Sequence, residues 1–237
     1  MKGLVILPTY NEADNIEELT GRILDADERL QVLIVDDNSP DGTGAIADRL
    51  AAASDRVRVL HREKKMGLAT AYITGFRHAI SNGYDLVFEM DADFSHDPCY
   101  LAVFLDRIAS HDVVIGSRYL SGMNVVNWPL HRLLLSYCAN IYARLITGMP
   151  FHDLTSGFKC FRRRALEGVD LDAVSSEGYA FQIELNYICW KKGFQLSEIP
   201  IIFTDRTAGK SKMGGKIIIE AVWIVWKLKF LSLVGRL

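Results

Sequence analysis

Residues 3–12 read GLVILPTYNE, an uninterrupted apolar run followed by a polar turn. A run of this kind is typical of a strand that is buried on both faces, as strands are in a parallel sheet. The pattern returns at QVLIV (31–35), which ends at Asp36-Asp37, and over 85–90, which ends at Asp91-Ala92-Asp93. Because helical periodicity separates these runs, the sequence predicts an α/β fold with a mostly parallel sheet and helices on both faces.

The same periodicities define the expected elements and domains. They predict strands over 3–8, 31–35, 57–61, 85–90, 113–116 and 195–203, and helices over 13–26, 44–53, 68–81, 129–148 and 181–192. Thr43 is expected to N-cap the helix that begins at Gly44. We expect one domain over residues 1–215 and a C-terminal amphipathic helix over 216–237.

The composition excludes several classes of protein. The 27 basic and 29 acidic residues give a formal charge of −2, which argues against a nucleic-acid binder that relies on a basic surface. A hydrophobic fraction of 49% is too high for a disordered chain. No stretch approaches the roughly 18 uncharged apolar residues that span a bilayer, and the chain enters its first strand without a signal-peptide pattern. The four cysteines form no CxxC pair, so we expect reduced core thiols in a cytosolic protein.

Two aspartates at the end of the 85–90 run are candidate metal ligands. Ligands of such sheets bind beyond the carboxyl ends of the strands, where the polar clusters of this chain fall. Asp91 and Asp93, at i and i+2, point to the same side and suit a hard divalent cation whose other ligands are nucleotide phosphates. The alternative is a solvated pair that opens the turn 94–98. His96 is expected to serve in that turn rather than in catalysis.

Polar residues after the first two strands suit a nucleoside. One of Asp36 and Asp37 is expected to accept hydrogen bonds from a base or a ribose, because the turn needs fewer carboxylates. Tyr10 offers an aromatic face to a base. The alternatives are structural: Asp41 stabilises the turn 39–42, and Asn11, Glu12 or Asp14 caps the following helix.

Positive side chains are expected at the same edge of the sheet. Arg118 follows the 113–116 strand, while Arg206, Lys210 and Lys212 lie in a loop after the last strand. Arginine grips a diphosphate with its planar fork, and lysine adds a point charge. The alternatives are a solvated loop or a surface attracted to anionic lipid. Carboxylates for a metal together with cations for phosphates fit transfer chemistry on a nucleotide diphosphate, and the absence of a GxxxxGK[ST] loop argues against P-loop chemistry.

Two amphipathic segments, 129–148 and 216–233, are too interrupted by polar residues to span a membrane. We expect them to lie in a membrane interface with their apolar faces in the lipid. Tryptophan and lysine side chains in and beside them suit that boundary: Trp128, Trp223, Trp226, Lys227 and Lys229. The alternative is that these helices pack on the sheet or on each other.

Taken in order, these motifs resemble the polyprenyl-phosphate (dolichyl-phosphate) mannosyltransferases of glycosyltransferase family 2, and the likeness covers nearly the whole chain. The matching segments are Pro8–Glu12, Asp36–Thr43, Asp91–His96, Gly116–Tyr119, Thr155–Phe158, Glu177–Glu184, Asp205-Arg206 and Ser211–Met213. The resemblance implies a GT-A (Rossmann-like) fold that transfers mannose from GDP-mannose to a polyprenyl phosphate with inversion. Lys159, where relatives commonly have arginine, and Ala69, where a glycine is expected, depart from the pattern.

The resemblance also implies roles for individual residues. Pro8, Tyr10, Glu12, Val35 and Asp37 would hold the nucleoside, while Asp91, Ala92, Asp93 and Arg118 would lie near the diphosphate and a divalent cation, Mg²⁺ or Mn²⁺. Ser95 would be a third metal position, and Arg206 and Lys212 would close over the phosphates. Asp91, Asp93, Arg118 and Arg206 would be catalytic. The acceptor phosphate is already ionised, so no general base is required.

The implied partners are GDP-mannose, polyprenyl phosphate and the cytoplasmic face of a membrane, where the chain would be peripheral. A membrane-anchoring partner subunit is also expected, and a nucleic acid is not. The alternatives are a related transferase that uses UDP-glucose or UDP-GlcNAc, and a non-catalytic scaffold. The intact Asp91-Ala92-Asp93 motif and basic loop argue against the scaffold.

Overall fold

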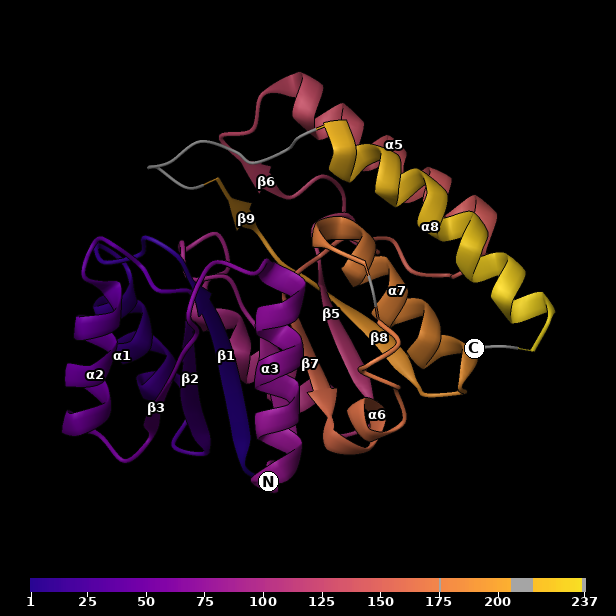
Figure 1. Cartoon of the computed structure of the whole chain (residues 1–237). Coiled ribbons are helices and arrows are strands. Elements are labelled where there is room, and N and C mark those ends of the chain that lie inside the picture. Colours follow the sequence, from indigo (N-terminus) through magenta and orange to yellow (C-terminus); the bar gives the residue numbers. More distant parts are fainter. Residues whose placement is uncertain (175, 206–214, 236–237) are drawn as a thin grey trace.

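The computed structural model describes residues 1–174, 176–205 and 215–235, and its centre is a seven-stranded sheet (Figure 1). The order across the sheet is β3 (Val57–His61), β2 (Leu30–Asp36), β1 (Gly3–Thr9), β4 (Leu86–Glu89), β7 (Lys159–Arg162), β5 (Val113–Ser117) and β8 (Leu196–Pro200). All these strands run parallel except β7, which is antiparallel to β4 and β5. The predicted mostly parallel sheet is confirmed, and β7 is a strand that the sequence did not predict.

Strand β1 is buried on both faces, as its continuous apolar run predicts. Its side chains alternate between two hydrophobic clusters: Leu4 and Ile6 face one, and Val5 and Leu7 face the other. Each of these four side chains is fully buried. The alternation follows from the two-residue period of a strand, and it requires helices on both sides of the sheet.

Helices cover both faces of the sheet, as predicted. The helices α1 (Ile16–Ala26), α2 (Thr43–Ala53) and α4 (Leu101–Arg107) contribute to one cluster, and a 3-10 turn over Pro98–Tyr100 leads into α4. The helices α3 (Leu68–Ser81), α6 (Arg163–Glu167) and α7 (Gly178–Lys191) contribute to the other. Ligand-binding residues are therefore left to the loops at the strand ends.

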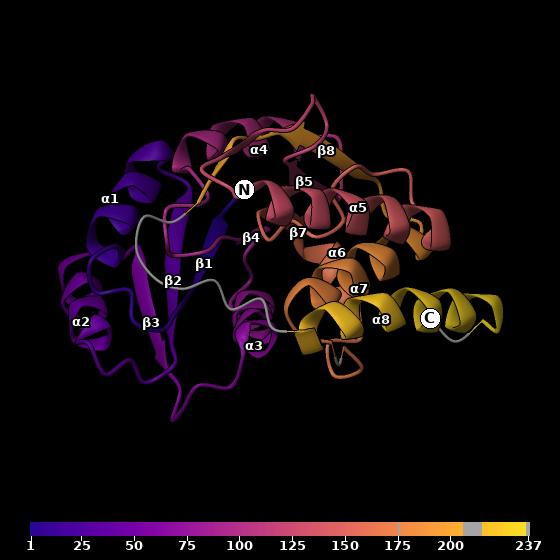
Figure 2. The same ribbon diagram turned by 90° about the horizontal axis from the view of Figure 1, so that it is seen from above.

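Two further helices, α5 (Leu130–Thr147) and α8 (Gly215–Leu233), lie side by side at the opposite end of the molecule from α1 and α2 (Figures 1 and 2). Trp226 Nε1 donates to the Tyr142 hydroxyl at 2.8 Å, which joins the two helices. A two-stranded parallel sheet of β6 (Val125–Val126) and β9 (Phe203–Thr204) lies near the start of α5. Within the described residues, no helix is long and apolar enough to cross a membrane.

Several local predictions are wrong. Thr43 is the first helical residue of α2 rather than its N-cap, because Gly42 (φ 94°) makes the turn and the Thr43 hydroxyl donates to Asp41 Oδ1 at 2.6 Å. The predicted strand 195–203 is interrupted, since β8 ends at Pro200. Of the four free cysteines, Cys160 and Cys189 are buried, whereas Cys99 and Cys138 are exposed.

Candidate active site

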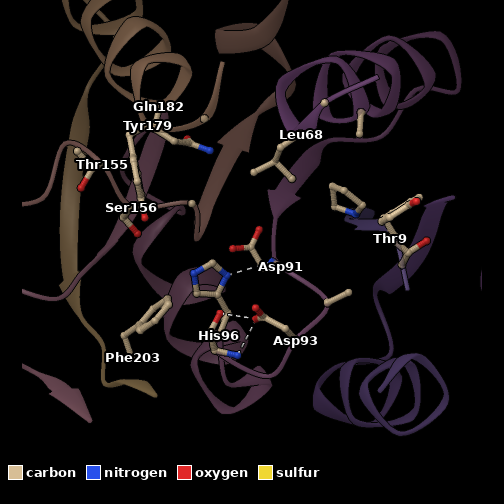
Figure 3. Close-up of a pocket in the computed structure, with 18 of the residues that line it drawn as sticks. Thr9, Leu68, Asp91, Asp93, His96, Thr155, Ser156, Tyr179, Gln182 and Phe203 are labelled. Carbon is tan, nitrogen blue, oxygen red and sulfur yellow. Dashed lines mark hydrogen bonds between the residues drawn. The ribbon is translucent and has the colours of Figure 1, made fainter. Parts of the chain in front are cut away.

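A pocket of about 450 Å³ lies at the carboxyl ends of the parallel strands (Figure 3). Its walls come from the ends of β1, β2, β4 and β5, from the start of α3 and α7, and from the segment before β7. Many of the predicted site residues line it: Pro8, Tyr10, Glu12, Asp37, Asp91, Ala92, Asp93, Ser95 and Arg118. Residues from distant parts of the sequence thus meet at one site, as the strand-end argument predicts.

The two aspartates after β4 are held by hydrogen bonds from their own loop and from α3. Tyr72 donates its hydroxyl to Asp91 Oδ1 at 3.1 Å, and the Asp91 amide donates to His96 Nδ1 at 3.0 Å. Asp93 Oδ1 accepts from the Ser95 amide at 3.1 Å and from the Ser95 hydroxyl at 2.6 Å. These contacts fix both carboxylates toward the pocket (Figure 3).

The electrostatics of this loop favour a cation. Burial, and then the negative charge of Asp93, raises the pKa of Asp91 to about 7. Oxygen ligands of this kind suit a hard divalent ion. Among the described residues, no group of three or more His, Cys, Asp and Glu side chains forms a complete metal site. Asp91 and Asp93 therefore fit a divalent cation only if a ligand such as a diphosphate supplies further oxygens.

His96 supports the loop, in agreement with the turn role that the sequence suggested. Burial lowers the pKa of its imidazole to about 4. Its ring stacks on Phe158 with centroids 4.9 Å apart. A neutral ring with Nδ1 accepting from the Asp91 amide positions the backbone of the aspartate.

The two aspartates after β2 have different environments. Asp36 stabilises the turn after β2, because its carboxylate accepts hydrogen bonds from the Thr9 hydroxyl at 2.9 Å and from the Ser39 hydroxyl at 2.6 Å. Asp37 lines the pocket, where it also accepts from Arg62 Nε at 2.5 Å and the Met66 amide at 3.2 Å. Asp37 is therefore the member of the pair that remains a candidate for nucleoside binding.

Val35, which the resemblance assigned to the nucleoside, does not line the pocket. Its side chain is fully buried in the hydrophobic core. Asp41 accepts from the Thr43 and Ala13 amides at 3.0 Å, so the structural alternative describes it. Arg206 and Lys212 lie outside the described residues, as does Lys210.

Arg118 lines the pocket, but its guanidinium forms an ion pair with a buried carboxylate. Its Nε and one terminal nitrogen each donate to Asp153 at 2.7 Å, and the same terminal nitrogen donates to the Thr155 hydroxyl at 2.8 Å. Although burial opposes it, the charge of Asp153 raises the pKa of Arg118. Contact between Arg118 and a diphosphate stays a prediction, since Asp153 occupies much of its fork.

Sequence reasoning missed several residues that line the pocket. Lys65 Nζ lies 3.8 Å from the ring centroid of Tyr10, and no role was assigned to its segment. Arg132 pairs with Asp205 at 2.7 Å and lies over the Trp128 ring. Tyr179 and Gln182 stand on the α7 side (Figure 3). The available signal for the α7 residues was the Glu177–Glu184 motif, which resembles the family but has no spacing that implies chemistry.

Carboxylates at the carboxyl edge of an α/β sheet, where such sheets bind their ligands, suit a nucleotide diphosphate and its cation, and comparisons with known proteins give the class of protein. The model of the family "Glycosyl transferase family 2" matches residues 4–169. The chain belongs to this family and is a glycosyltransferase.

The curated relatives are more specific. The polyprenol monophosphomannose synthase of Mycolicibacterium smegmatis is 50% identical, over 94% of this chain and 84% of the relative. The undecaprenyl-phosphate mannosyltransferase of Micrococcus luteus is 45% identical, over 94% of this chain and 91% of the relative. These relatives place the chain beside the polyprenyl-phosphate mannosyltransferases, the group that its motifs resemble.

Solved structures support the GT-A fold. A mannosyltransferase from Pyrobaculum calidifontis, in complex with GDP-Man and Mn²⁺, has a TM-score of 0.59 at 18% identity and covers 99% of this chain and 74% of its own. Glucosyl-3-phosphoglycerate synthase from Mycobacterium tuberculosis, in complex with Mn²⁺, UDP and phosphoglyceric acid, has a TM-score of 0.66 at 16% identity, with 99% and 78% covered.

Proposed function

We propose that this glycosyltransferase transfers mannose from GDP-mannose to the phosphate of a polyprenyl phosphate, with inversion at the sugar. The observation that carries the proposal is the 50% identity to a polyprenol monophosphomannose synthase over 94% of the chain. The GDP-Man complex of the Pyrobaculum neighbour supports the choice of donor. The pocket supports it as well, because the aspartates and the nucleoside-side residues line the same cavity.

In this proposal, Pro8, Tyr10, Glu12 and Asp37 hold the nucleoside. Asp91 and Asp93 hold Mg²⁺ or Mn²⁺ together with the diphosphate oxygens, as the Mn²⁺ complexes of the neighbours suggest. The cation, when bound, offsets the negative charge that develops on the departing GDP. The hydrogen bonds from Tyr72 and Ser95 keep the two carboxylates in place, so no reorganisation is needed during transfer.

The acceptor needs no catalytic base in this proposal. A phosphate monoester is largely ionised near neutral pH, so its oxygen is already nucleophilic. The protein has to hold that oxygen in line with the bond to the leaving group. Arg206 and Lys212, which lie outside the described residues, are proposed to contact the phosphates; Asp205, the residue before Arg206, lines the pocket.

The proposal is tested by incubating the full chain with radiolabelled GDP-mannose, polyprenyl phosphate and Mg²⁺, followed by organic extraction. We expect label in the organic phase that depends on both the lipid and the cation. Water-soluble label in every reaction, with an intact folded protein, would contradict the proposed function.

GDP is expected to bind at least about tenfold more tightly than UDP, a difference of about 1.4 kcal/mol. A guanine offers a larger face to Tyr10, and its N–H groups suit the carboxylates of Glu12 and Asp37. Isothermal titration of each nucleotide with Mg²⁺ present measures the ratio. Tighter binding of UDP would instead favour the alternative transferase that uses UDP-glucose or UDP-GlcNAc.

We further propose that α5 and α8 place the enzyme on a membrane surface as a peripheral protein at the cytoplasmic face. Helix α5 turns its polar stripe toward the protein: Arg132 pairs with Asp205, Ser136 accepts from the Tyr119 hydroxyl, and Asn140 is buried. Several of its apolar side chains are exposed instead, with Leu145 77% exposed, although Tyr142 and Ile146 pack against the core. This inverted polarity fits a helix whose outer face meets lipid.

Helix α8 continues the same surface. Its exposed side chains recur at helical spacing, and they include Trp223, Trp226, Phe230 and Leu233. Lys227 lies among them and suits an anionic headgroup. The two helices pack against each other, as the alternative predicted, and still leave these outward faces uncovered. Because Trp128 and Arg132 line the pocket near the start of α5, a lipid acceptor would pass from this surface to the pocket.

The double variant Trp223→Ser/Phe230→Ser is expected to lower the partition of the protein onto anionic liposomes at least about tenfold. Each side chain is more than 60% exposed, and burying a large apolar side chain contributes about 1.5–3 kcal/mol. Flotation measures the partition. Val103→Ser, which removes an exposed apolar side chain from α4 on the other side of the molecule, is the control and should float normally. Failure of the unmodified chain to float would point to the separate anchoring subunit instead.

A further inference from the structure

Three buried polar side chains, Glu89, Lys159 and Gln182, lie together next to the pocket. Glu89 on β4 and Lys159 on β7 are register partners across the sheet, and both are fully buried with the ammonium and carboxylate 3.8 Å apart. Lys159 Nζ also donates to the side-chain oxygen of Gln182 and, at 3.4 Å, to its backbone carbonyl. Gln182 on α7 lines the pocket. The group therefore connects the sheet core to the substrate site.

Burying these charged groups is unfavourable for the stability of the core. Burying an ion pair costs several kcal/mol per ion, and well-packed apolar residues often replace such pairs without loss of stability. The Lys159 ammonium and the Gln182 amide face the Glu89 carboxylate, but neither lies within normal hydrogen-bond distance of its oxygens. Lys159 donates its one side-chain hydrogen bond within normal reach to Gln182 Oε1. Its effect is to fix which end of the Gln182 amide is oxygen and which is nitrogen.

The nitrogen of that amide carries two N–H groups, and the Glu89 carboxylate that faces it lies beyond normal hydrogen-bond distance. Gln182 is 3% exposed, and its Nε2 makes no hydrogen bond with a described residue. A Cβ at Gly157 would lie 3.7 Å from Gln182 Nε2 and 3.8 Å from Asp91 Oδ2. The amide and the aspartate thus border the same small space, which the glycine keeps open. A buried N–H group without an acceptor destabilises a protein, so a ligand atom is the natural acceptor for the N–H group that does not face Glu89.

The position of Gln182 indicates which part of a nucleotide sugar supplies that acceptor. Thr9, at the end of β1, lies on one side of Asp91 and Asp93, and Gln182 and Tyr179 lie on the other (Figure 3). A donor whose diphosphate meets the aspartates therefore carries its sugar toward α7. An uncharged amide also suits a neutral hydroxyl oxygen next to carboxylates.

We propose that Gln182 Nε2 donates a hydrogen bond to one hydroxyl oxygen of the sugar being transferred, and that Lys159, backed by Glu89, is the positioning residue for this amide. The proposal rests on the proposed function, since it assumes a GDP-mannose donor. It makes Gln182 a determinant of sugar specificity rather than of nucleotide binding.

The test compares GDP-mannose with its 2-, 3-, 4- and 6-deoxy analogues as donors. For the unmodified enzyme, we expect kcat/KM to fall about 3- to 15-fold for one of these analogues, the range for a hydrogen bond between uncharged groups. In Gln182→Met, that analogue and GDP-mannose should be used equally well. The ratio between donors is measured within one protein, so it does not depend on the fraction that is folded.

Asn186→Leu is the matched control, because it removes a buried amide one turn further along α7 that does not line the pocket. It should keep the donor ratio of the unmodified enzyme. In Lys159→Met, as in Gln182→Met, the ratio of kcat/KM between GDP-mannose and the analogue should fall to about one. Lys159→Arg should keep the ratio of the unmodified enzyme. An unchanged ratio in Gln182→Met, or a change confined to KM for the lipid phosphate, would overturn the inference alone. An unmodified enzyme that transfers no mannose would overturn the proposed function and this inference with it.

Discussion

Replacing Asp93 by alanine is expected to lower kcat for mannose transfer by about 10²–10³-fold or more, with the fold preserved. Removal of a single preorganised group that stabilises transition-state charge has an effect of this size. Asp93 lines the pocket beside Asp91, and its Oδ1 atom is held by two donors from Ser95. Asp91→Ala should have a similar effect. Radiolabel transfer measures turnover, and thermal unfolding shows whether the variant is folded.

The control for these variants is Asp97→Ala. Asp97 belongs to the same loop and caps the turn that leads into α4, where it accepts from the Cys99 amide at 2.9 Å, but it does not line the pocket. It should retain near-normal turnover. We expect the loss of kcat in each variant to match the loss that a chelator causes in the unmodified enzyme. If either variant retained near-normal turnover with the chelator present, the proposed metal role of the two aspartates would be wrong.

The fold was predictable where local pattern and burial agree. Strand β1 is buried on both faces and reads as an apolar run, and α3 spans Leu68–Ser81 as predicted because Asn82 and Gly83 end it. Strand β7 was missed because its four residues, KCFR, have no distinctive alternation. Its antiparallel place between β4 and β5 is decided by tertiary pairing, which a single sequence does not display.

The site was predictable to the extent that strand ends carry the chemistry. Asp91, Asp93 and Asp37 follow predicted strands, and all three line one pocket. The pairing of Arg118 with Asp153 was not predictable, because the two residues are 35 positions apart and nothing in either segment indicates the other. The orientation of Gln182 likewise depends on Lys159, a contact across 23 positions between β7 and α7.

Helix α5 shows the limit of amphipathic patterns. The sequence displays Arg132, Ser136, Asn140 and Arg144 at four-residue spacing, which predicts a helix with a polar stripe. The pattern alone does not say which side faces the protein. A surface helix ordinarily turns its apolar side inward. Here the polar stripe has partners on the protein, namely Asp205, Tyr119 and Leu154, so part of the apolar side is left exposed.

Asp153→Asn is expected to lower the free energy of unfolding by about 3–5 kcal/mol, because it leaves a buried guanidinium without its counter-charge. Arg118 is 4% exposed and Asp153 is fully buried. For a chain of this size, the change corresponds to a fall in Tm of roughly 6–20 °C. Chemical denaturation gives the free energy, and calorimetry gives the Tm. Glu17→Gln is the control, because it breaks an exposed pair with Arg49 that contributes about 0–1 kcal/mol.

The pH dependence provides an independent check on the same pair. Although burial acts to raise it, the charge of Arg118 holds the pKa of Asp153 below its ordinary value. Stability from a lowered carboxyl pKa is complete above the unfolded value of 3.8 and is lost as the pH falls through the folded value. The difference between the unmodified protein and Asp153→Asn should therefore be constant near neutrality and should narrow below about pH 4. A loss of less than about 1 kcal/mol at neutral pH would mean that Arg118 does not depend on Asp153. Its guanidinium would then be available to the diphosphate, as the sequence first suggested.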